Sequence, residues 1–301
     1  MRVISVLPSA TEIVCALGHG SELVARSSEC DFPPEVRGLP AVMRPRTWDS
    51  DRASRQIDDR VRRARGANES LYELDVEALR SLRPDLLLTQ DLCGVCSVTP
   101  EEVTSACELA GVRPLIVSLT PTNLAEVWDT VEQVGSALGD ETAGTELARS
   151  LRSRTRPRPR TGRKVVIVEW LDPPILAGLW TPDLVTAAGG EPLGPSSARP
   201  GARTTWKEIA HLSPDLIIVS PCSFSVARTN RELDASASLR AEVVATRPPM
   251  GLYVADEAYF SRPGPRLADG AELVRTLLER GAPDGPMPVE LLLPRSPGVT
   301  A

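Results

Sequence analysis

The chain begins with MRVISVLPSATEIVCALG (residues 1–18), in which a short apolar run passes directly into a helical pattern. VISVL (3–7) is typical of a buried β-strand, and the Pro8-Ser9 pair ends it. Ser9 is followed three residues later by Glu12, the spacing of a capping box, so we expect a helix from Ser9 to Leu17. A strand that leads at once into a helix is the first step of an alternating α/β fold.

The same alternation continues along the chain. Further strands are expected at LVARSS (23–28), DLLLTQ (85–90), RPLIVSL (113–119), KVVIVEW (164–170), DLIIVS (215–220) and GLYVAD (251–256). Helices are expected near 54–65, 75–82, 100–110, 182–188, 205–212 and 264–280. This order predicts an α/β protein with two Rossmann-like lobes, each built on a central parallel sheet.

Residues 123–152 have apolar side chains at close to helical period, interrupted only by three glycines. We expect one long rigid helix of about 45 Å, which would join the two lobes. The predicted organisation is an N-terminal lobe, a linking helix, a C-terminal lobe and a flexible Pro-rich tail, at 1–120, 121–153, 154–282 and 283–301.

Composition excludes several classes of function. The 301 residues are 42% hydrophobic and 25% charged, with a formal charge of -6, the mix of a soluble globular protein with no nucleic-acid partner. No apolar stretch approaches the roughly 20 residues of a spanning helix, so no membrane insertion is expected. Met1-Arg2 runs straight into the first strand without a separate signal segment or lipobox, which predicts a cytoplasmic protein, or an extracytoplasmic importer component only if the N-terminus was trimmed.

Four cysteines follow predicted strands, where the ligands of open α/β sheets bind. Cys93 and Cys96 form a CxxC pair, the spacing that lets two thiolates reach one tetrahedral metal. Cys30 and Cys222 would complete a four-thiolate site for zinc or an iron–sulfur cluster. Thiol redox chemistry and an inert role as small apolar residues are the alternatives.

The usual catalytic signatures are absent from the sequence. No GxGxxG follows the first strand, and GxxxxGK[ST] does not occur. Both histidines, His19 and His211, fall near helix ends rather than at predicted strand ends. No histidine is therefore placed to serve a Ser–His–Asp triad, and no catalytic residue is predicted. Ser9 and Thr11, at the start of the first helix, could bind an anionic group or simply cap that helix.

Several segments together resemble the helical-backbone class (class III) of periplasmic binding proteins, especially the cobalamin-binding components of ABC importers. These segments are SVLPSATEIVCALG (5–18), SSECDFPPEV (27–36), LRPDLLLTQ (82–90), LDPPILAGLWTPDLVTAAGGE (171–191), WKEIAHLSPDLIIV (206–219) and EAYFSRPGPRLADGAEL (257–273). The resemblance spans nearly all of 2–281 and is more specific for the fold than for the ligand.

This resemblance implies non-catalytic binding of a flat ligand, a cobalamin-like corrinoid or related metal chelate, in a cleft between the lobes. A Cys-ligated zinc or iron–sulfur protein or enzyme is the alternative. The positions that match the family's ligand-stacking residues are Trp48, Trp170, Pro174, Trp180, Tyr259 and Phe260. Core packing is the alternative for the tryptophans.

The resemblance also implies docking to a membrane permease through two surface glutamates, which correspond here to Glu101 and Glu208. Each carboxylate could instead serve only to favour the N-terminus of its helix. The cysteines, the long insertion at 31–74 and the missing signal segment depart from the importers. We therefore expect a cytoplasmic branch of the family with a Cys-rich cleft.

Overall fold

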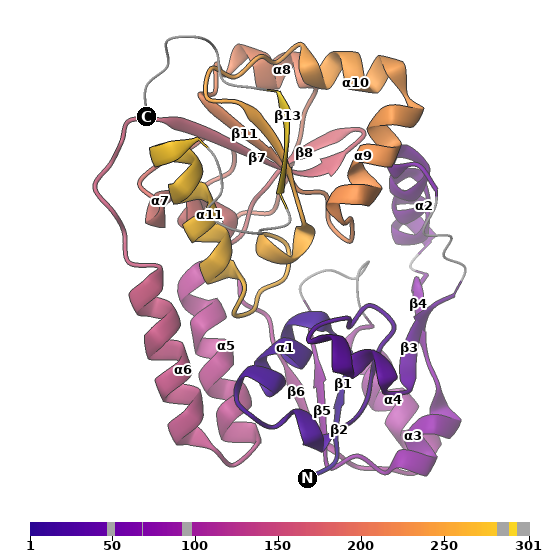
Figure 1. The fold of residues 1–301 in the computed structure, drawn as a ribbon. Coiled ribbons are helices and arrows are strands. Elements are labelled where there is room, and N and C mark those ends of the chain that lie inside the picture. The colour runs from indigo at the N-terminus through magenta and orange to yellow at the C-terminus, as the bar shows by residue number, and fades with distance from the viewer. Residues whose placement is uncertain (47–51, 68, 92–97, 282–288, 294–301) are drawn as a thin grey trace. The chain divides into compact units, whose positions relative to one another are not determined.

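A computed structural model describes residues 1–46, 52–67, 69–91, 98–281 and 289–293 (Figure 1). The chain divides into two compact units, both of α/β type, which confirms the predicted fold class. Unit 1 consists of Met1–Arg52, Asp59–Pro121 and Ala125–Leu151, and unit 2 of Ala53–Asp58, Thr122–Leu124 and Arg152–Ala301.

Unit 1 is built on a six-stranded sheet in the order β4-β3-β2-β1-β5-β6. Its strands are β1 Val3–Ser5, β2 Leu23–Ser27, β3 Ala41–Pro45, β4 Tyr72–Leu74, β5 Leu86–Thr89 and β6 Leu115–Ser118. All neighbours pair in parallel except β3 and β4 at one edge. The central strands β1 and β5 are wholly buried, as expected for parallel strands covered on both faces.

The helices associated with this sheet are α1 Pro8–Ala16, α2 Ser54–Ala67, α3 Val76–Leu82 and α4 Pro100–Ala110, with short 3-10 turns η1 Gly20–Glu22 and η2 Pro34–Gly38. The predicted capping box of the first helix is wrong. Helix α1 begins at Pro8, its N-cap is Leu7, and no side chain caps it. Proline at the first helical position has a backbone suited to starting the helix, so Ser9 already lies inside it.

The expected single helix over 123–152 is also wrong, because the segment forms α5 Leu124–Ala137 and α6 Glu141–Arg154. Gly139 takes a left-handed backbone (φ +77°) and ends α5. Asp140 then accepts the backbone N–H of Ala143 at 3.0 Å in the first turn of α6. The two helices lie side by side (Figure 1). A Cβ on Gly135 would lie 2.7 Å from the Cα of Gly144.

Unit 2 contains a second sheet in the order β10-β8-β7-β11-β12-β13, with β9 also paired to β7. Its strands are β7 Lys164–Leu171, β8 Pro174–Leu176, β9 Glu191–Pro192, β10 Ala202–Arg203, β11 Leu216–Val219, β12 Leu252–Ala255 and β13 Val289–Leu293. The central strands β7, β11 and β12 are parallel. The predicted flexible tail is wrong over 289–293, because β13 pairs antiparallel with β12.

The helices of unit 2 are α7 Thr181–Ala187, α8 Trp206–His211, α9 Val226–Ala235, α10 Ala237–Val244 and α11 Leu267–Arg280, with the 3-10 turn η3 Glu257–Tyr259. One core cluster combines β7, β11 and β12 side chains with apolar residues of α8, α9 and α10. No helix in the described part of the chain is long and apolar enough to cross a membrane.

The contact between Gly135 and Gly144 yields a stability prediction. Gly135→Ala places a methyl group against backbone atoms, so we expect a loss of about 1–3 kcal/mol in unfolding free energy. Gly66 in α2 has open space around its Cβ position, and Gly66→Ala is the matched control, expected to be neutral or stabilising by up to about 1 kcal/mol. Urea unfolding of both variants measures this difference. Equal stability of Gly135→Ala and the unmodified chain would contradict the close helix contact.

A second prediction concerns His19, which lies after α1 and contacts the α5–α6 turn. Its imidazole is 2.8 Å from the Glu22 carboxylate and 3.3 Å from that of Asp140. These hydrogen bonds, that to Glu22 foremost, raise the pKa of His19 above its usual 6.5. The same pairing lowers the pKa of Glu22 from 4.5.

Because the folded-state pKa of His19 is raised, its stabilising contribution is complete below pH 6.5 and is lost as pH rises through the folded value. The carboxylates must remain ionised, so the contribution also fades as pH falls through the lowered pKa of Glu22. We expect His19→Asn to destabilise most at about pH 5.5 and least at about pH 8.5 in urea titrations. His211→Asn, at an exposed histidine, is the control for loss of a histidine side chain. A destabilisation by His19→Asn that does not change with pH would contradict this assignment.

Candidate functional site

The carboxyl ends of three parallel strands in unit 2 are held together by loop hydrogen bonds. The backbone N–H of Cys222, just past β11, donates to the carbonyl of Glu169 in β7 at 2.9 Å. The Ser220 hydroxyl donates to the carbonyl of Asp256, just past β12, at 3.2 Å. Residues that follow these strands are thus fixed at one edge of the sheet, where ligands of open α/β folds bind.

An aromatic pair lies at this edge. Trp170, near the end of β7, contacts Phe224 with ring centroids 5.4 Å apart and a tilt of 51°. The guanidinium carbon of Arg228 lies 4.3 Å from the centroid of the same Phe224 ring. Phe224 is buried and Trp170 is partly exposed, so Trp170 is the ring of this pair that solvent or a ligand can reach. Its buried indole N–H has no hydrogen-bond acceptor among the described residues.

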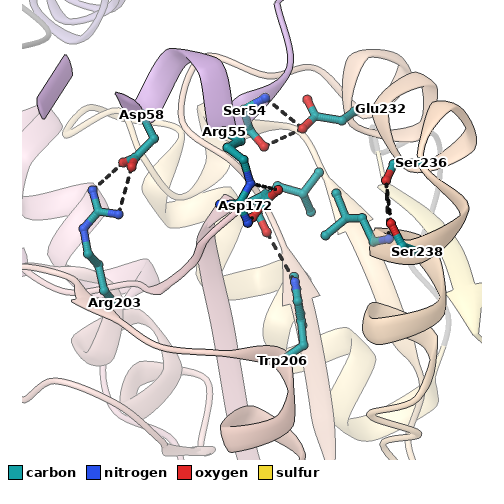
Figure 2. Close-up of polar contacts among 11 residues, drawn as sticks. Ser54, Arg55, Asp58, Asp172, Arg203, Trp206, Glu232, Ser236 and Ser238 are labelled. Atoms are coloured by element: carbon teal, nitrogen blue, oxygen red, sulfur yellow. Dashed lines mark hydrogen bonds and ion pairs between the residues drawn. The ribbon is translucent and has the colours of Figure 1, made fainter. Parts of the chain in front are cut away.

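The arginine of this stack is paired with a buried carboxylate that also binds the start of α2. Arg228 Nη1 donates to Glu232 Oε2 at 3.2 Å, an i,i+4 pair on α9. The other oxygen of Glu232 accepts the backbone N–H of Ser54 at 2.8 Å and also its hydroxyl. The carboxylate therefore lies at the N-terminus of α2, where the helix dipole favours a negative charge (Figure 2).

Residues 54–58, the first turn of α2, belong to unit 2, and two further ion pairs hold this turn to the rest of that unit (Figure 2). Arg55 donates through Nε and Nη2 to the two oxygens of Asp172, at 2.9 and 2.7 Å. Arg203 binds both oxygens of the buried Asp58, with Nη1 at 3.0 Å. Bidentate geometry of this kind fixes orientation as well as distance. The first turn of α2 is therefore an integral part of the unit 2 surface.

The other predicted stacking residues have different environments. Trp180 and Phe260 are 5% and 2% exposed, and the Trp180 indole N–H donates to the Phe260 carbonyl at 2.7 Å. The structure assigns both rings to the core rather than to a ligand-facing surface. Pro174 is buried in β8, and Tyr259 is partly exposed with the Arg266 guanidinium 6.0 Å from its ring. Trp48 lies outside the described residues.

The corresponding edge of the unit 1 sheet holds a closed polar cluster. The Thr11 hydroxyl lies 2.9 Å from Ser5 Oγ and 3.0 Å from Cys30 Sγ. Cys30 is only 1% exposed, and Ser9 and Thr11 are buried as well. The Ser5, Thr11 and Cys30 side chains satisfy one another inside the unit, so the geometry supports a structural role for Cys30 and Thr11 rather than an open anion site.

The four predicted cysteine ligands are described only in part. Cys222 is partly exposed, whereas Cys93 and Cys96 lie outside the described residues. In the part of the chain that the structure covers, no three His, Cys, Asp or Glu side chains gather in a way that could hold a metal ion. The four-thiolate site stays a prediction with no structural support.

The two predicted docking glutamates both lie in the first turn of a helix. Glu208 closes the capping box of α8, accepting from Thr204 Oγ1 at 2.9 Å and from the Thr205 N–H at 2.9 Å. The side-chain hydrogen bond from Thr204, followed by those from Thr205, lowers the pKa of Glu208. Glu101 is exposed on α4 and takes no part in the capping box there, which Thr99 and Glu102 form.

Sequence reasoning missed Phe224, Glu232 and Ser54 as parts of this site. A local signal existed for one contact, because Arg228 and Glu232 have the i,i+4 spacing of a helical ion pair after the N-cap Ser225. No local pattern predicts Ser54 as the partner of Glu232, since 178 positions separate them.

Comparisons with known proteins agree with this architecture. No protein-family model matches the chain. It is 24% identical over 293 residues to an uncharacterised ABC transporter substrate-binding lipoprotein of Bacillus subtilis, covering 90% of this chain and 77% of that protein. It is 23% identical over 288 residues to the vitamin B12-binding protein of Vibrio cholerae, covering 92% of this chain and 89% of that protein.

Solved structures give the same result. A periplasmic haem-binding protein from Pseudomonas aeruginosa superposes with a TM-score of 0.70 at 20% identity, covering 98% of this chain and 99% of that one. The periplasmic vitamin B12-binding protein of Vibrio cholerae gives 0.62 at 20% identity, covering 93% and 97%. The relatives and structural neighbours of this chain are thus class III periplasmic binding proteins of the B12, haem and siderophore importer type, which confirms the resemblance.

The placement of the cysteines predicts their reactivity. Burial raises the pKa of the Cys107 thiol, and burial together with Glu12 raises that of Cys15. Cys30 is buried against Thr11, whereas Cys222 is partly exposed. We expect iodoacetamide to label Cys222 in the folded protein at least about tenfold faster than Cys30 or Cys107. Mass spectrometry of timed reactions measures these rates, and urea-unfolded protein is the control. Native labelling of Cys30 as fast as that of Cys222 would contradict the closed cluster in unit 1.

Proposed function

We propose that the chain is a non-catalytic substrate-binding protein for a corrinoid such as cobalamin. The observation that carries the proposal is the partly exposed Trp170, fixed by Phe224 at the carboxyl ends of the unit 2 strands. An aromatic surface of this kind suits the flat face of a macrocycle. The alignment with a vitamin B12-binding protein, which covers 92% of this chain at 23% identity, supports the same ligand class.

The charge balance near Trp170 favours a corrinoid over haem. Four arginines of unit 2 are each paired with a carboxylate: Arg228 with Glu232, Arg203 with Asp58, Arg55 with Asp172 and Arg262 with Glu257. Haem presents two carboxylates at its edge, which would compete for these cations. A corrin ring presents uncharged amides, which bind neutral polar surfaces without displacing an existing pair.

The partner and compartment remain predictions. The B. subtilis relative is named as an ABC transporter substrate-binding lipoprotein, so we propose an ABC permease as partner, with Glu101 and Glu208 as candidate docking residues. Cell fractionation with an antibody against the full chain tests the predicted cytoplasmic location.

Isothermal titration of the purified chain with cyanocobalamin, haemin and a ferric hydroxamate tests the proposed ligand. We expect cyanocobalamin to bind with the highest affinity, at least about tenfold tighter than haemin, a difference of about 1.4 kcal/mol. Absence of binding by all three compounds would overturn the proposed function. Tighter binding of haemin than of cyanocobalamin would overturn the corrinoid assignment alone.

Two matched tryptophan variants test the role of Trp170. A phenyl ring keeps only part of the indole stacking, so Trp170→Phe should cost about 0.5–1 kcal/mol and weaken cyanocobalamin binding roughly 2–5-fold. Trp128→Phe changes a buried tryptophan of α5 in unit 1 and should leave the affinity within about twofold. An unchanged affinity in Trp170→Phe would contradict the placement of the ligand on this ring.

A further inference from the structure

The buried carboxylate of Glu232 has two kinds of partner, one on each oxygen. Oε2 accepts from Arg228 at 3.2 Å, and Oε1 accepts the Ser54 N–H at 2.8 Å together with the Ser54 hydroxyl. Only 6% of its side chain and 11% of that of Arg228 are exposed. A charge this deeply buried is retained only when such partners satisfy it.

The two oxygens therefore couple two structural elements. On one side Glu232 caps the N-terminus of α2, whose first turn is further held by the Arg55–Asp172 and Asp58–Arg203 pairs. On the other side it holds Arg228 with its guanidinium 4.3 Å from the centre of the Phe224 ring. Phe224 in turn contacts Trp170, the ring on which the proposed function depends.

The electrostatic consequence concerns Arg228. A guanidinium at the edge of an aromatic ligand platform is a natural partner for a carboxylate on a ligand, because it can bind both oxygens. Arg228 is already ion-paired with Glu232, and the hydrogen bonds from Ser54 at the start of α2 keep the Glu232 carboxylate in place. An anionic ligand edge would have to displace a hydrogen-bonded buried carboxylate, whereas an uncharged edge would not.

We propose that Glu232 is a specificity-determining residue, which neutralises Arg228 and so excludes ligands with carboxylates at their edge in favour of ligands with uncharged amides. This inference rests on the proposed function and names the feature by which its ligand is selected. Ser54 acts as a positioning residue, because its N–H and hydroxyl hold the Glu232 carboxylate against α2.

The test is the ratio of haemin to cyanocobalamin affinity, measured by titration in a set of variants. Glu232→Gln keeps a side-chain oxygen for Ser54 but removes the negative charge. It should therefore raise the ratio at least about fivefold by releasing Arg228 for a ligand carboxylate. Arg228→Met leaves the Glu232 charge unpaired and should lower the ratio. The double variant Arg228→Met/Glu232→Gln should lose the gain seen in Glu232→Gln.

Glu242→Gln removes an exposed carboxylate from α10 and is the matched control, expected to leave both affinities unchanged. Circular dichroism and urea unfolding establish that each variant is folded. If Glu232→Gln does not fold, Arg228→Met still tests the proposal, because its expected change has the opposite sign.

If Glu232 has only a structural role, Glu232→Gln should weaken the binding of haemin and of cyanocobalamin by the same factor. The ratio of the two affinities would then stay unchanged, and that result would overturn the proposal. If the unmodified chain binds neither haemin nor cyanocobalamin, the proposed function fails first and this inference fails with it. If the unmodified chain binds cyanocobalamin and no variant shifts the ratio, only the role of Glu232 is refuted.

Discussion

The architecture of the unit 2 surface depends on one buried carboxylate. Glu232 is stable in its buried position because Ser54, the N-terminus of α2 and Arg228 surround it with hydrogen-bond donors and positive charge. Removing any of these partners leaves the Glu232 charge less well compensated, which is costly in a low-dielectric environment. Figure 2 shows Glu232 at the first turn of α2. The position of this turn, the orientation of Arg228 and the stack on Phe224 therefore form one interdependent arrangement.

This arrangement gives the surface a definite chemical character. Trp170 supplies an apolar ring face, and Arg55, Arg203 and Arg228 are each paired with a carboxylate. Under our proposal this surface selects a ligand by excluding ionised ones, because an ionised ligand must break an existing ion pair that a neutral ligand leaves intact. The fold alone does not specify this property, since relatives of the same architecture include proteins named for haem as well as for vitamin B12.

Much of the fold is predictable from sequence, and the failures have physical causes. Apolar runs such as DLLLTQ and DLIIVS form the central parallel strands, because complete burial requires uniformly apolar residues. The helix break at Gly139 was missed because glycine in a periodic segment can either weaken a helix or end it. Strand β13 is not predicted because the prolines on both sides of it are typical of an irregular tail. Trp170 was predicted from the resemblance, whereas the Ser54–Glu232 contact arises from tertiary structure alone.

Hydrogen–deuterium exchange of the full chain, with and without saturating cyanocobalamin, tests the central claim most directly. If the ligand lies on Trp170 and the surface depends on Glu232, exchange should slow in peptides covering 168–172, 221–228 and 53–58. Exchange at 206–211, in α8, should stay unchanged. Saturating binding that leaves the first three segments unprotected would contradict the account.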